Sequence, residues 1–473
     1  MGKYKSDSKT KKSISKREES STREIILDGL IDIVENKTFS HNIINQLLSK
    51  HQDLEKRDRA FISNVIMGTL KHLLEMDYII NQFSSIKIEK MKPVIRNVLR
   101  SGVYQLKYMD NIPPSAVCNE AVKIVKKRGF GSLAGFVNGN LRSIVRNLEQ
   151  LSYPKDRLSY LEVKYSIPVW ILKLWSEDDN FVNAEGLPDW GMIERVARTF
   201  QEKRPLTIRT NLSKIQPKVL KENLESQGIA VEEHPHLDYA FKISGIDTLE
   251  TLEDFNSGNF YVQDVSSMLV GELANPSGNS FVLDLCAAPG GKSLHLADKM
   301  LCTDDSANIY AKECDGEILE AGVVLACDLT DRKVALIQDN IARAGFENIK
   351  TMKKDATILD EEWVEKADIV LADVPCSGLG ILGKKPDLRY NTSLENIEKL
   401  VMLQRKILTN ACAYVQSQGI LIFSTCTINS KENTENVKWL LENHPEFQLV
   451  HTSQLLPGIN DCDGFFISMF KKC

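Results

Sequence analysis

The first third of the chain carries a helical pattern of hydrophobic positions. Apolar residues between positions 23 and 148 recur at helical spacing, and alternation of the strand kind is absent. The pattern breaks only briefly, around 36–37, 86–88 and 112–114. It therefore predicts a compact all-helical domain. The positions that carry the pattern most clearly are Ile25, Ile26, Leu30, Ile33, Val34, Phe61, Ile62, Val65, Ile66, Leu70, Val94, Ile95, Val98 and Leu99.

Between residues 151 and 258 the pattern changes to a mixture of strands and helices. The segment LTIRTNL (206–212) and the segment 240–243 are typical of strands. Residues 217–227, between these two segments, have the spacing of a helix. We therefore expect a small α/β subdomain in this part of the chain.

From residue 260 onward, apolar runs of strand length alternate with helical stretches. Such alternation predicts a parallel, doubly wound α/β sheet. Sheets of this kind bind ligands just beyond the carboxyl ends of their strands, so the residues that follow each strand are candidates for a site. The expected strands are 281–285, 323–327, 369–373 and 419–424, with a further one near 349–352.

These patterns divide the chain into four parts. Residues 1–20 are rich in Lys and Ser and nearly free of large apolar side chains, which predicts a disordered basic tail. The all-helical domain is expected at 21–150 and the small α/β subdomain at 151–258. The doubly wound domain is expected at 259–473.

The composition of the 473 residues is that of a soluble globular protein, with 42% hydrophobic and 26% charged residues. No apolar stretch approaches the roughly 18 residues that a membrane helix needs, and no apolar segment follows the basic N-terminus to make a secretory signal. We expect a cytoplasmic protein with no membrane partner. The 10 cysteines include no CxxC pair, which argues against a disulfide scaffold and against a Cys-rich metal site.

Basic residues gather locally although the net charge of the chain is -5. Residues 1–23 contain eight Lys or Arg against three acids, and residues 123–146 contain six basic residues and no acid. A local basic patch can hold a phosphate backbone even on an acidic protein. Solvated surface is the alternative interpretation. The six residues are Lys123, Lys126, Lys127, Arg128, Arg142 and Arg146.

A loop of small residues, DLCAAPGGKS (284–293), follows the first expected strand of the doubly wound domain. Small residues let the backbone approach a ligand, with a helix N-terminus beyond them. The end of this loop resembles that of a phosphate-binding P-loop. A P-loop, however, needs a glycine where this chain has Cys286, and Pro289 stands inside the loop, so an NTPase is disfavoured. A tight turn without a ligand is the remaining alternative.

Two acidic residues after later strands are further candidates. Asp328 ends the strand at 323–327, a position from which a carboxylate often binds ribose hydroxyls; a helix N-cap is the alternative. Asp355, after the strand near 349–352, is a weaker candidate of the same kind.

Two cysteines follow two successive strands. Asp373-Val374-Pro375-Cys376 ends one strand and Ser424-Thr425-Cys426 ends the next. If these strands pair, they lie about 4.8 Å apart and both thiols can face one small substrate. A single cysteine here would more often be a buried structural residue. The pair, together with the carboxylate of Asp373, indicates a reactive site. The helix that follows is expected to be capped by Asn429 and Glu432.

With these motifs, the chain resembles the RsmB/NOP family of RNA cytosine-5 methyltransferases, most closely the bacterial 16S rRNA members of the Sun/Fmu type. The N-terminal segment 113–142 resembles the NusB-type RNA-binding domain, a fusion that marks this branch. The matching C-terminal segments are FYVQDVSSML (260–269), DLCAAPGGKS (284–293), DNIARAGFENI (339–349), ADVPCSGLG (372–380), KKPDLRY (384–390), FSTCTINSKENTENV (423–437) and DGFFISMFKK (463–472).

The resemblance implies a Rossmann-like methyltransferase domain that uses S-adenosylmethionine, preceded by the small α/β subdomain and a NusB-like helical domain. In it Cys426 would attack C6 of the cytosine and Cys376 would assist product release. Asp373 would contact the base and lie beside the cofactor. Asp328 would bind the ribose of the cofactor and Asp355 its adenine side. The loop that cradles its methionine end would be Cys286, Ala287, Ala288, Pro289, Gly290, Gly291 and Lys292.

The family's chemistry also implies the partners. The substrate would be small-subunit rRNA in a single-stranded or loop region, because the base has to leave its stack. Lys292 and Arg389 are candidate cations on the substrate side, with solvated surface as the alternative. We expect no metal and a monomer.

Three alternatives remain at this point. A tRNA cytosine-5 methyltransferase would use the same chemistry, and a non-catalytic RNA-binding assembly factor would use only the helical domain. A DNA cytosine-5 methyltransferase attacks with the Pro-Cys cysteine and needs no Thr-Cys partner, so Cys426 argues for RNA. The chain departs from the family in a longer segment between Lys292 and Asp328, where Glu313 could compete with Asp328 for the ribose.

Overall fold

The computed structural model describes residues 21–246, 248–303, 311–312, 319–320 and 322–473. The expected tail at 1–20 and the candidate Glu313 lie outside the described residues. Contacts divide the chain into two compact units, which we treat separately. The first is Met1–Thr38, Asn42–Thr69 and Ile79–Gln150, and the second is Phe39–His41, Leu70–Tyr78 and Leu151–Cys473.

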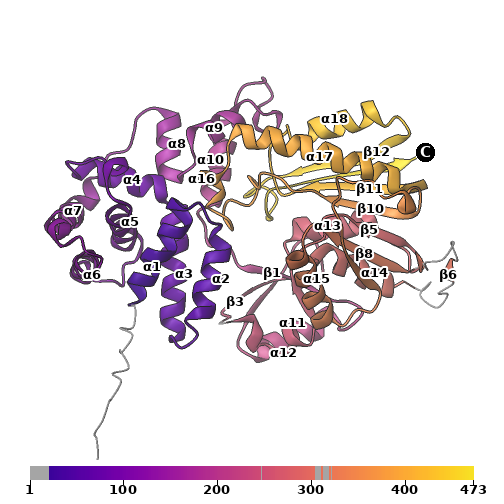
Figure 1. Cartoon of the computed structure of the whole chain (residues 1–473), viewed down its shortest axis with the longest axis horizontal. Coiled ribbons are helices and arrows are strands. Elements are labelled where there is room, and N and C mark those ends of the chain that lie inside the picture. Colours follow the sequence, from indigo (N-terminus) through magenta and orange to yellow (C-terminus); the bar gives the residue numbers. More distant parts are fainter. Residues whose placement is uncertain (1–20, 247, 304–310, 313–318, 321) are drawn as a thin grey trace, which may run out of the picture. The chain divides into compact units, whose positions relative to one another are not determined.

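The first unit is all-helical, as the hydrophobic pattern predicts (Figure 1). Ser21 caps its first helix through a reciprocal capping box with Glu24, and Pro114 opens a later helix at a position where proline costs no hydrogen bond. Its helices, some of which run on into the second unit, are α1 (Thr22–Leu30), η1 (Ile31–Glu35), α2 (Ser40–Lys50), α3 (Lys56–Lys71), α4 (Leu73–Phe83), η2 (Ile88–Lys90), α5 (Pro93–Tyr108), α6 (Pro114–Lys127), η3 (Gly131–Leu133), α7 (Ala134–Asn147) and η4 (Leu148–Gln150).

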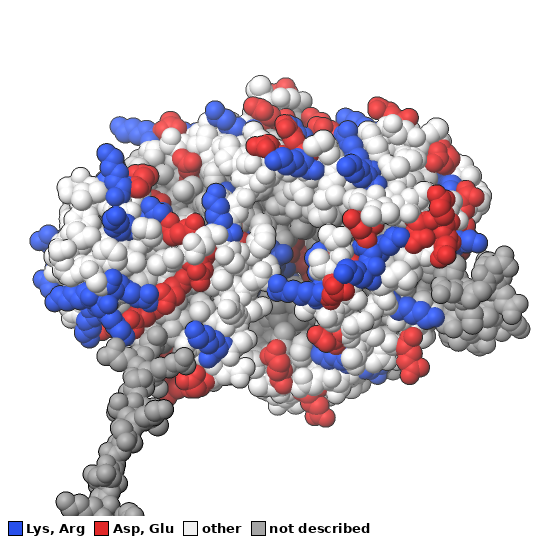
Figure 2. Space-filling model, in the orientation of Figure 1, with Lys and Arg blue, Asp and Glu red and all other residues white. Residues whose placement is uncertain are grey.

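Lys and Arg side chains gather on this unit over α6 and α7, beside a band of acidic side chains (Figure 2). Although the stretch at 123–146 contains no acid in the sequence, acidic side chains from other helices lie beside it. Lys127 lies 3.1 Å from Glu24 and Arg128 lies 2.7 Å from Asp28, both acids of α1. The cations of the stretch that remain exposed with no acidic partner among the described residues are Lys126, Arg142 and Arg146.

The second unit begins with helices α8 (Arg157–Tyr165), α9 (Val169–Ser176) and α10 (Trp190–Thr199), which pack around the buried Trp175. The small α/β subdomain follows as a four-stranded antiparallel sheet in the order β2-β3-β1-β4, covered by α11 (Pro217–Ser226) and α12 (Glu253–Asn256). Its strands are β1 (Leu206–Thr210), β2 (Ala230–Glu233), β3 (Ala240–Ser244) and β4 (Phe260–Val262).

Two strands of this sheet differ from the sequence expectation. The pattern did not reveal β2, because its side chains are mostly exposed and show no alternation. Strand β4 follows the expected boundary at 258, yet it pairs with β1. The small sheet thus takes its last strand from the segment that leads into the larger sheet.

The larger sheet has seven strands in the order β12-β13-β11-β10-β5-β8-β9. Strands β11, β10, β5, β8 and β9 are parallel, whereas β13 is antiparallel to both β11 and β12. The sheet is doubly wound, as expected, and departs from the parallel arrangement only at this edge, because the last two strands form a hairpin. The strands are β5 (Phe281–Asp284), β8 (Val323–Asp328), β9 (Ile349–Lys353), β10 (Ala367–Asp373), β11 (Val415–Thr425), β12 (Phe447–Leu455) and β13 (Phe465–Lys472).

Helices cover both faces of this sheet, as expected for a Rossmann-like domain (Figure 1). Neighbouring residues of one strand point to opposite faces: Val282 packs in one hydrophobic cluster and Leu283 in the other. Helices α13 (Val265–Ala274), α14 (Gly291–Leu301) and α15 (Asp331–Ala344) cover one face, and α17 (Leu394–Tyr414) and α18 (Thr434–Asn443) cover the other.

The remaining elements are short. They are η5 (Asp179–Phe181), η6 (Leu249–Thr251), η8 (Glu361–Trp363), α16 (Leu388–Asn391) and a two-stranded hairpin of β6 (Ala311–Lys312) and β7 (Leu319–Glu320). This hairpin lies in the longer segment between Lys292 and Asp328. Within the described residues, no helix has the length and hydropathy needed to cross a membrane.

The strand order turns at the centre of the sheet. From β5 the chain continues to β8 and β9 on one side, and then returns to β10 and β11 on the other. Open α/β sheets bind ligands at such a point, outside the carboxyl ends of the strands. The register places Leu371 of β10 opposite Asp284 of β5, and Asp373 of β10 opposite Ser424 of β11.

Candidate active site

A cavity of about 250 Å³ opens at the carboxyl ends of β5, β10 and β11. It brings together most of the predicted site residues, which stand as far apart in the sequence as Cys286 and Cys426. Gly290, Cys376, Asp328 and Asp355 are predicted site residues that do not line it. The lining residues are Tyr261, Val262, Gln263, Asp264, Ser266, Ser267, Asp284, Cys286, Ala287, Ala288, Pro289, Gly291, Lys292, Asp373, Ile381, Cys426, Asp463 and Phe465.

The loop after β5 needs its two glycines. Gly290 has φ +105°, a conformation that a side chain would strain, and a Cβ on Gly291 would lie 2.9 Å from the ring of Tyr261. Helix α14 begins at Gly291, so its N-terminal end points into the loop. The small residues therefore hold the backbone close to the space where a ligand would lie, as the sequence predicts.

Arg209 of β1 supports this loop from the small sheet. Its guanidinium is fully buried and donates hydrogen bonds to the carbonyl of Gly291 (3.2 Å) and the side chain of Gln263 (2.9 Å). A third hydrogen bond goes to Asn211 (2.6 Å). Burial lowers the pKa of Arg209 to about 10. The small subdomain is thus tied to the first turn of α14.

Asp284, the last residue of β5, lies at the floor of the cavity. Its side chain is fully buried and accepts a hydrogen bond from the Ser293 hydroxyl at 2.6 Å. The other carboxylate oxygen has no hydrogen-bond partner among the described residues. Burial raises the pKa of Asp284 to about 7. The sequence pattern assigns no role to Asp284, although an acid at the end of a buried strand is a signal of a ligand site.

Asp328 braces the loop at 284–293 from β8. Its carboxylate accepts hydrogen bonds from the backbone N–H of Ala288 (3.0 Å) and of Leu329 (2.7 Å), and it forms an ion pair with Lys333 (2.9 Å). Asp355, in contrast, stabilises a local turn: its carboxylate accepts hydrogen bonds from the backbone N–H and the hydroxyl of Thr357. These hydrogen bonds lower the pKa of Asp355.

The two predicted cysteines are in contact. The Sγ atoms of Cys376 and Cys426 lie 3.2 Å apart. With Cys376 as the donor, this hydrogen bond lowers the pKa of Cys426, assisted by the charges of Lys385 and Lys292. The same bond and burial raise the pKa of Cys376 well above its usual range. Cys426 is therefore the thiol that ionises first.

A buried carboxylate holds the Pro-Cys loop in place. Glu432 accepts hydrogen bonds from the backbone N–H of Ser377 (2.9 Å) and from its hydroxyl. Gln404 of α17 donates both to Glu432 (3.0 Å) and to the carbonyl of Pro375 (3.0 Å). The expectation that Asn429 and Glu432 cap the next helix was wrong. Helix α18 begins at Thr434, because Glu432 instead satisfies polar groups of a distant loop.

Asp373 sits between a cation and a hydroxyl. Its carboxylate accepts from the ammonium group of Lys292 at 2.6 Å and from the Ser424 hydroxyl at 2.7 Å. The same ammonium lies 5.1 Å from the centroid of the Phe465 ring. Lys292 therefore points into the cavity, as expected of a cation on the substrate side.

Arg389 does not lie in the cavity, so its proposed role on the substrate side was wrong. The side chain is fully buried. It donates to backbone carbonyls of Lys71 (3.0 Å), Tyr165 (3.1 Å) and Ser166 (3.3 Å). These hydrogen bonds compensate part of the cost of burying the guanidinium, and they join elements of the second unit.

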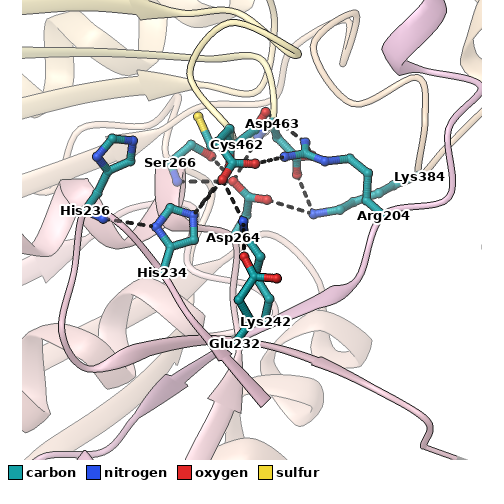
Figure 3. Close-up of polar contacts among 11 residues, drawn as sticks. Arg204, Glu232, His234, His236, Lys242, Asp264, Ser266, Lys384, Cys462 and Asp463 are labelled. Carbon is teal, nitrogen blue, oxygen red and sulfur yellow. Dashed lines mark hydrogen bonds and ion pairs between the residues drawn. The ribbon is translucent and has the colours of Figure 1, made fainter. Parts of the chain in front are cut away.

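Two further carboxylates form the rim of the cavity (Figure 3). Asp264 and Asp463 share the ammonium of Lys384, at 3.1 and 2.6 Å. Burial and the charge of Asp264 raise the pKa of Asp463 to about 6. Burial also raises the pKa of Asp264. The charge of Lys384 and the hydrogen bonds from the Asp463 N–H and from Ser266 have a larger, opposite effect, so the pKa of Asp264 is lowered to about 2.

The loop that carries Asp463 is pinned by the small sheet (Figure 3). Arg204 donates to the carbonyl of Cys462 at 2.9 Å, and Lys242 of β3 donates to Asp461 at 2.7 Å. The sequence analysis assigns no role to these residues, although Asp264, Lys384 and Asp463 stand in segments that carry the family resemblance. Their contacts join positions between 79 and 258 residues apart, which local periodicity does not reveal. Among the described residues, no group of three or more His, Cys, Asp or Glu side chains could hold a metal ion.

The arrangement can support nucleophilic chemistry by a thiol on a small substrate. A thiol with a lowered pKa faces a cavity beside a carboxylate–ammonium pair, and a second thiol stands behind it. A thiolate is the nucleophilic form of cysteine, and an adjacent acid or hydrogen-bond donor can stabilise charge that develops on the substrate.

Comparisons with known proteins agree with this domain order. The pattern of the NusB family matches residues 20–146, and that of 16S rRNA methyltransferase RsmB/F matches residues 317–471. The chain is 31% identical over 471 residues to "Probable ribosomal RNA small subunit methyltransferase B" of Bacillus subtilis, covering 96% of this chain and 99% of the relative. It is 30% identical to the protein of the same name from Synechocystis sp., over 96% and 99%.

A solved structure extends the likeness to three dimensions. The crystal structure of PH0851 superposes with a TM-score of 0.76 at 26% identity, covering 95% of this chain and 97% of the other. The helical domain, the small subdomain and the larger sheet are therefore a shared architecture.

Proposed function

Because the chain belongs to the family of ribosomal RNA small subunit methyltransferase B, we propose that it transfers a methyl group from S-adenosylmethionine to C5 of a cytosine in 16S rRNA through a covalent adduct with Cys426. The observation that carries this proposal is the contact of Cys376 with Cys426 beside the Asp373–Lys292 pair, at one cavity.

Cys426 acts as the nucleophile. Cytosine C5 is a poor nucleophile, but addition of a thiolate to C6 turns C5 into an enamine carbon. Only a few per cent of an ordinary thiol is ionised at neutral pH. The hydrogen bond from Cys376 and the nearby lysines lower the pKa of Cys426 and so raise its thiolate fraction.

Asp373 and Lys292 orient the base. A carboxylate at this place can accept from the exocyclic amine and exchange a proton with N3, which develops charge when the thiolate adds. The Ser424 hydroxyl and the Lys292 ammonium hold the carboxylate of Asp373 in one orientation. Phe465, beneath Lys292, offers the base an aromatic face.

Cys376 assists the release of the product. After C5 has gained the methyl group, a base such as water takes the proton from C5. The electrons of that C–H bond re-form the C5–C6 double bond, and the bond between C6 and the Cys426 sulfur breaks. The sulfur leaves with the electron pair as a thiolate, which the hydrogen bond from the Cys376 thiol stabilises. The raised pKa of Cys376 keeps this donor protonated.

The residues around the loop fit S-adenosylmethionine, which supplies an electrophilic methyl group when bound. The unpartnered oxygen of Asp284 is an acceptor that an α-ammonium group would satisfy. The loop from Cys286 to Lys292 would cradle the methionine end. Asp328 would bind ribose hydroxyls, since a carboxylate has about four acceptor sites. Asp355 would lie on the adenine side.

The helical domain would hold RNA next to the target base. Lys126, Arg142 and Arg146 are exposed and free to contact phosphates, whereas neighbouring cations are engaged with acids of α1. The target cytosine has to leave its stack to meet both thiols, which favours a single-stranded or loop region. We place this activity in the cytoplasm, with the chain acting as a monomer.

The proposal is tested by trapping the adduct. The full chain is incubated with S-adenosylmethionine and 16S rRNA and analysed on a denaturing gel. Cys376→Ala should accumulate a protein–RNA adduct and Cys426→Ala should abolish it. Cys302→Ser, at an exposed cysteine outside the cavity, is the control and should behave as the unaltered chain.

An adduct that survives Cys426→Ala would contradict the assignment of the nucleophile. Bisulfite sequencing of the treated RNA then tests the substrate. Protection of a cytosine in 16S rRNA is expected, and protection in tRNA alone would favour the tRNA alternative.

A further inference from the structure

The two thiols of the cavity are held in contact by the loops that carry them. The Cys376 and Cys426 sulfurs are 3.2 Å apart, against about 2.05 Å in a disulfide. The loops are bonded to one another, since Gly380 N–H donates to the carbonyl of Cys426 (3.1 Å) and the hydroxyls of Ser377 and Thr427 lie 2.9 Å apart. The sulfurs would have to approach by about 1.2 Å to form a disulfide.

The two thiols differ in access and in ionisation. Cys426 lines the cavity, and Cys376 stands behind it. Cys426 also has the lowered pKa of the pair. Oxidation of cysteine follows thiolate character and exposure, so a small oxidant that enters the cavity meets the more reactive sulfur first.

Four other cysteines of the described part of the chain lack this combination. Burial raises the pKa of Cys286, Cys327 and Cys412 well above the usual range, which keeps them as unreactive thiols. Cys302 is exposed, but burial of part of its side chain raises its pKa as well.

We propose that Cys376 and Cys426 are a reversible redox-modification site, at which a peroxide converts the two thiols into a disulfide. This inference concerns the same two sulfurs as the proposed methyl transfer, but the oxidation does not require that methyl transfer takes place. With both sulfurs joined, Cys426 has no thiolate to offer a substrate, so oxidation switches the site off.

The reaction has two steps, with hydrogen peroxide as the oxidant. The Cys426 thiolate attacks one peroxide oxygen: an S–O bond forms, the O–O bond breaks, and hydroxide leaves and takes up a proton as water. Cys376, on losing its proton, attacks the resulting sulfenic acid: the S–S bond forms, the S–O bond breaks, and the second oxygen leaves as water. Two thiols are oxidised and one peroxide is reduced to two waters.

The test uses the full chain and hydrogen peroxide. After treatment, remaining thiols are alkylated and the non-reduced protein is digested and mapped by mass spectrometry. We expect a cross-linked peptide pair that contains Cys376 and Cys426, loss of methyl transfer to RNA, and recovery of both free thiols and of methyl transfer on adding dithiothreitol.

A matched variant separates this site from general oxidation. Cys376→Ser removes the second thiol, so Cys426 should proceed to the sulfinic acid, which dithiothreitol does not reverse. Cys302→Ser should retain the cross-link and its reversal. Absence of the cross-link, or equal over-oxidation of Cys426 in the unaltered chain and in Cys376→Ser, would overturn the proposal.

The mass readout is independent of methylation. A cross-link in a protein that never forms an RNA adduct would leave the redox site standing and remove the proposed function. An RNA adduct in a protein that forms no cross-link would support the proposed function and overturn the redox site.

Discussion

The aspartate side chains of the cavity have different pKa values because their surroundings differ. Asp284 and Asp463 are buried and have pKa values of about 7 and about 6, whereas Asp264, beside the same lysine as Asp463, has a pKa of about 2. Burial penalises the charged form, and a neighbouring cation or N–H restores it. Asp373 is held by a lysine and a serine, which suits a group that has to keep one orientation.

Replacing Asp284 by Asn should change how stability depends on pH. Between pH 3.8 and about 7 the unfolded chain loses the Asp284 proton while the folded chain keeps it, so rising pH favours unfolding. The penalty reaches on the order of 4 kcal/mol above pH 7. Asp284→Asn should remove this decline, as measured by urea midpoints at several pH values. Asp331→Asn, at an exposed acid, is the control; an unchanged slope in Asp284→Asn would contradict the assignment.

Replacing Lys292 by Met should slow adduct formation while leaving RNA binding nearly intact. The carboxylate of Asp373 would lose its cation and its fixed orientation, and general acid–base assistance contributes about 10²-fold or more. Single-turnover kinetics should show a fall in the rate constant of adduct formation that is larger than any rise in the half-saturating RNA concentration. Lys299→Met, on the same helix but paired with Glu272, is the matched control. Equal losses in both variants would point to the stability of α14 instead.

At the scale of elements, the loops that carry the predicted site residues depend on supports that come from other parts of the second unit. Glu432 and Gln404 hold the Pro-Cys loop after β10, and Arg209 of the small sheet holds the first turn of α14. Arg204 and Lys242 pin the loop before β13. The small subdomain thus acts as one wall of the active site.

Glu432→Ala should destabilise the second unit and disturb the Pro-Cys loop. It leaves the Ser377 N–H and the Gln404 amide without their acceptor in a buried place, at a cost of about 1–3 kcal/mol each. Glu432→Gln keeps one carbonyl acceptor and should cost less. Chemical denaturation measures the first effect, and the lifetime of the RNA adduct measures the second. Equal stability of the two variants would argue against this support.

At the scale of the molecule, charge distribution matters more than net charge. The chain carries a net charge of -5, so RNA binding has to rest on cations that no acid neutralises. In the helical unit, α1 neutralises Lys127 and Arg128, and Glu120 lies 2.7 Å from Lys123. Lys126, Arg142 and Arg146 are left to face a phosphate backbone.

Replacing Lys126 and Arg146 together by Ala should weaken binding of 16S rRNA and make it less sensitive to salt. Each lost phosphate contact lowers the slope of log K against log salt by about 0.7–0.9. Filter binding at several salt concentrations measures the slope, and kcat should stay unchanged. Lys123→Ala, at the ion-paired lysine of the same helix, is the control. A double variant with the slope of the unaltered chain would exclude this surface from RNA binding.

The sequence by itself determined the local elements and the position of the motifs. Helical and strand periodicity, small residues after β5 and cysteines after β10 and β11 are local features, so Cys376, Cys426, Asp373 and the loop from Cys286 could be predicted. The antiparallel pairing of β13 could not, since periodicity does not show a strand's direction.

Only the tertiary structure decided which side chains face one another and how deeply they are buried. From the sequence, Arg389 is expected at the surface, but in the structure it is buried. Glu432 is expected to cap a helix, but it binds a distant loop. Asp463 lies beside Asp264, although the two residues are 199 positions apart in the sequence. The physical reason is that hydrogen bonds, desolvation and pKa values depend on neighbours in space, whereas periodicity reports only neighbours along the chain.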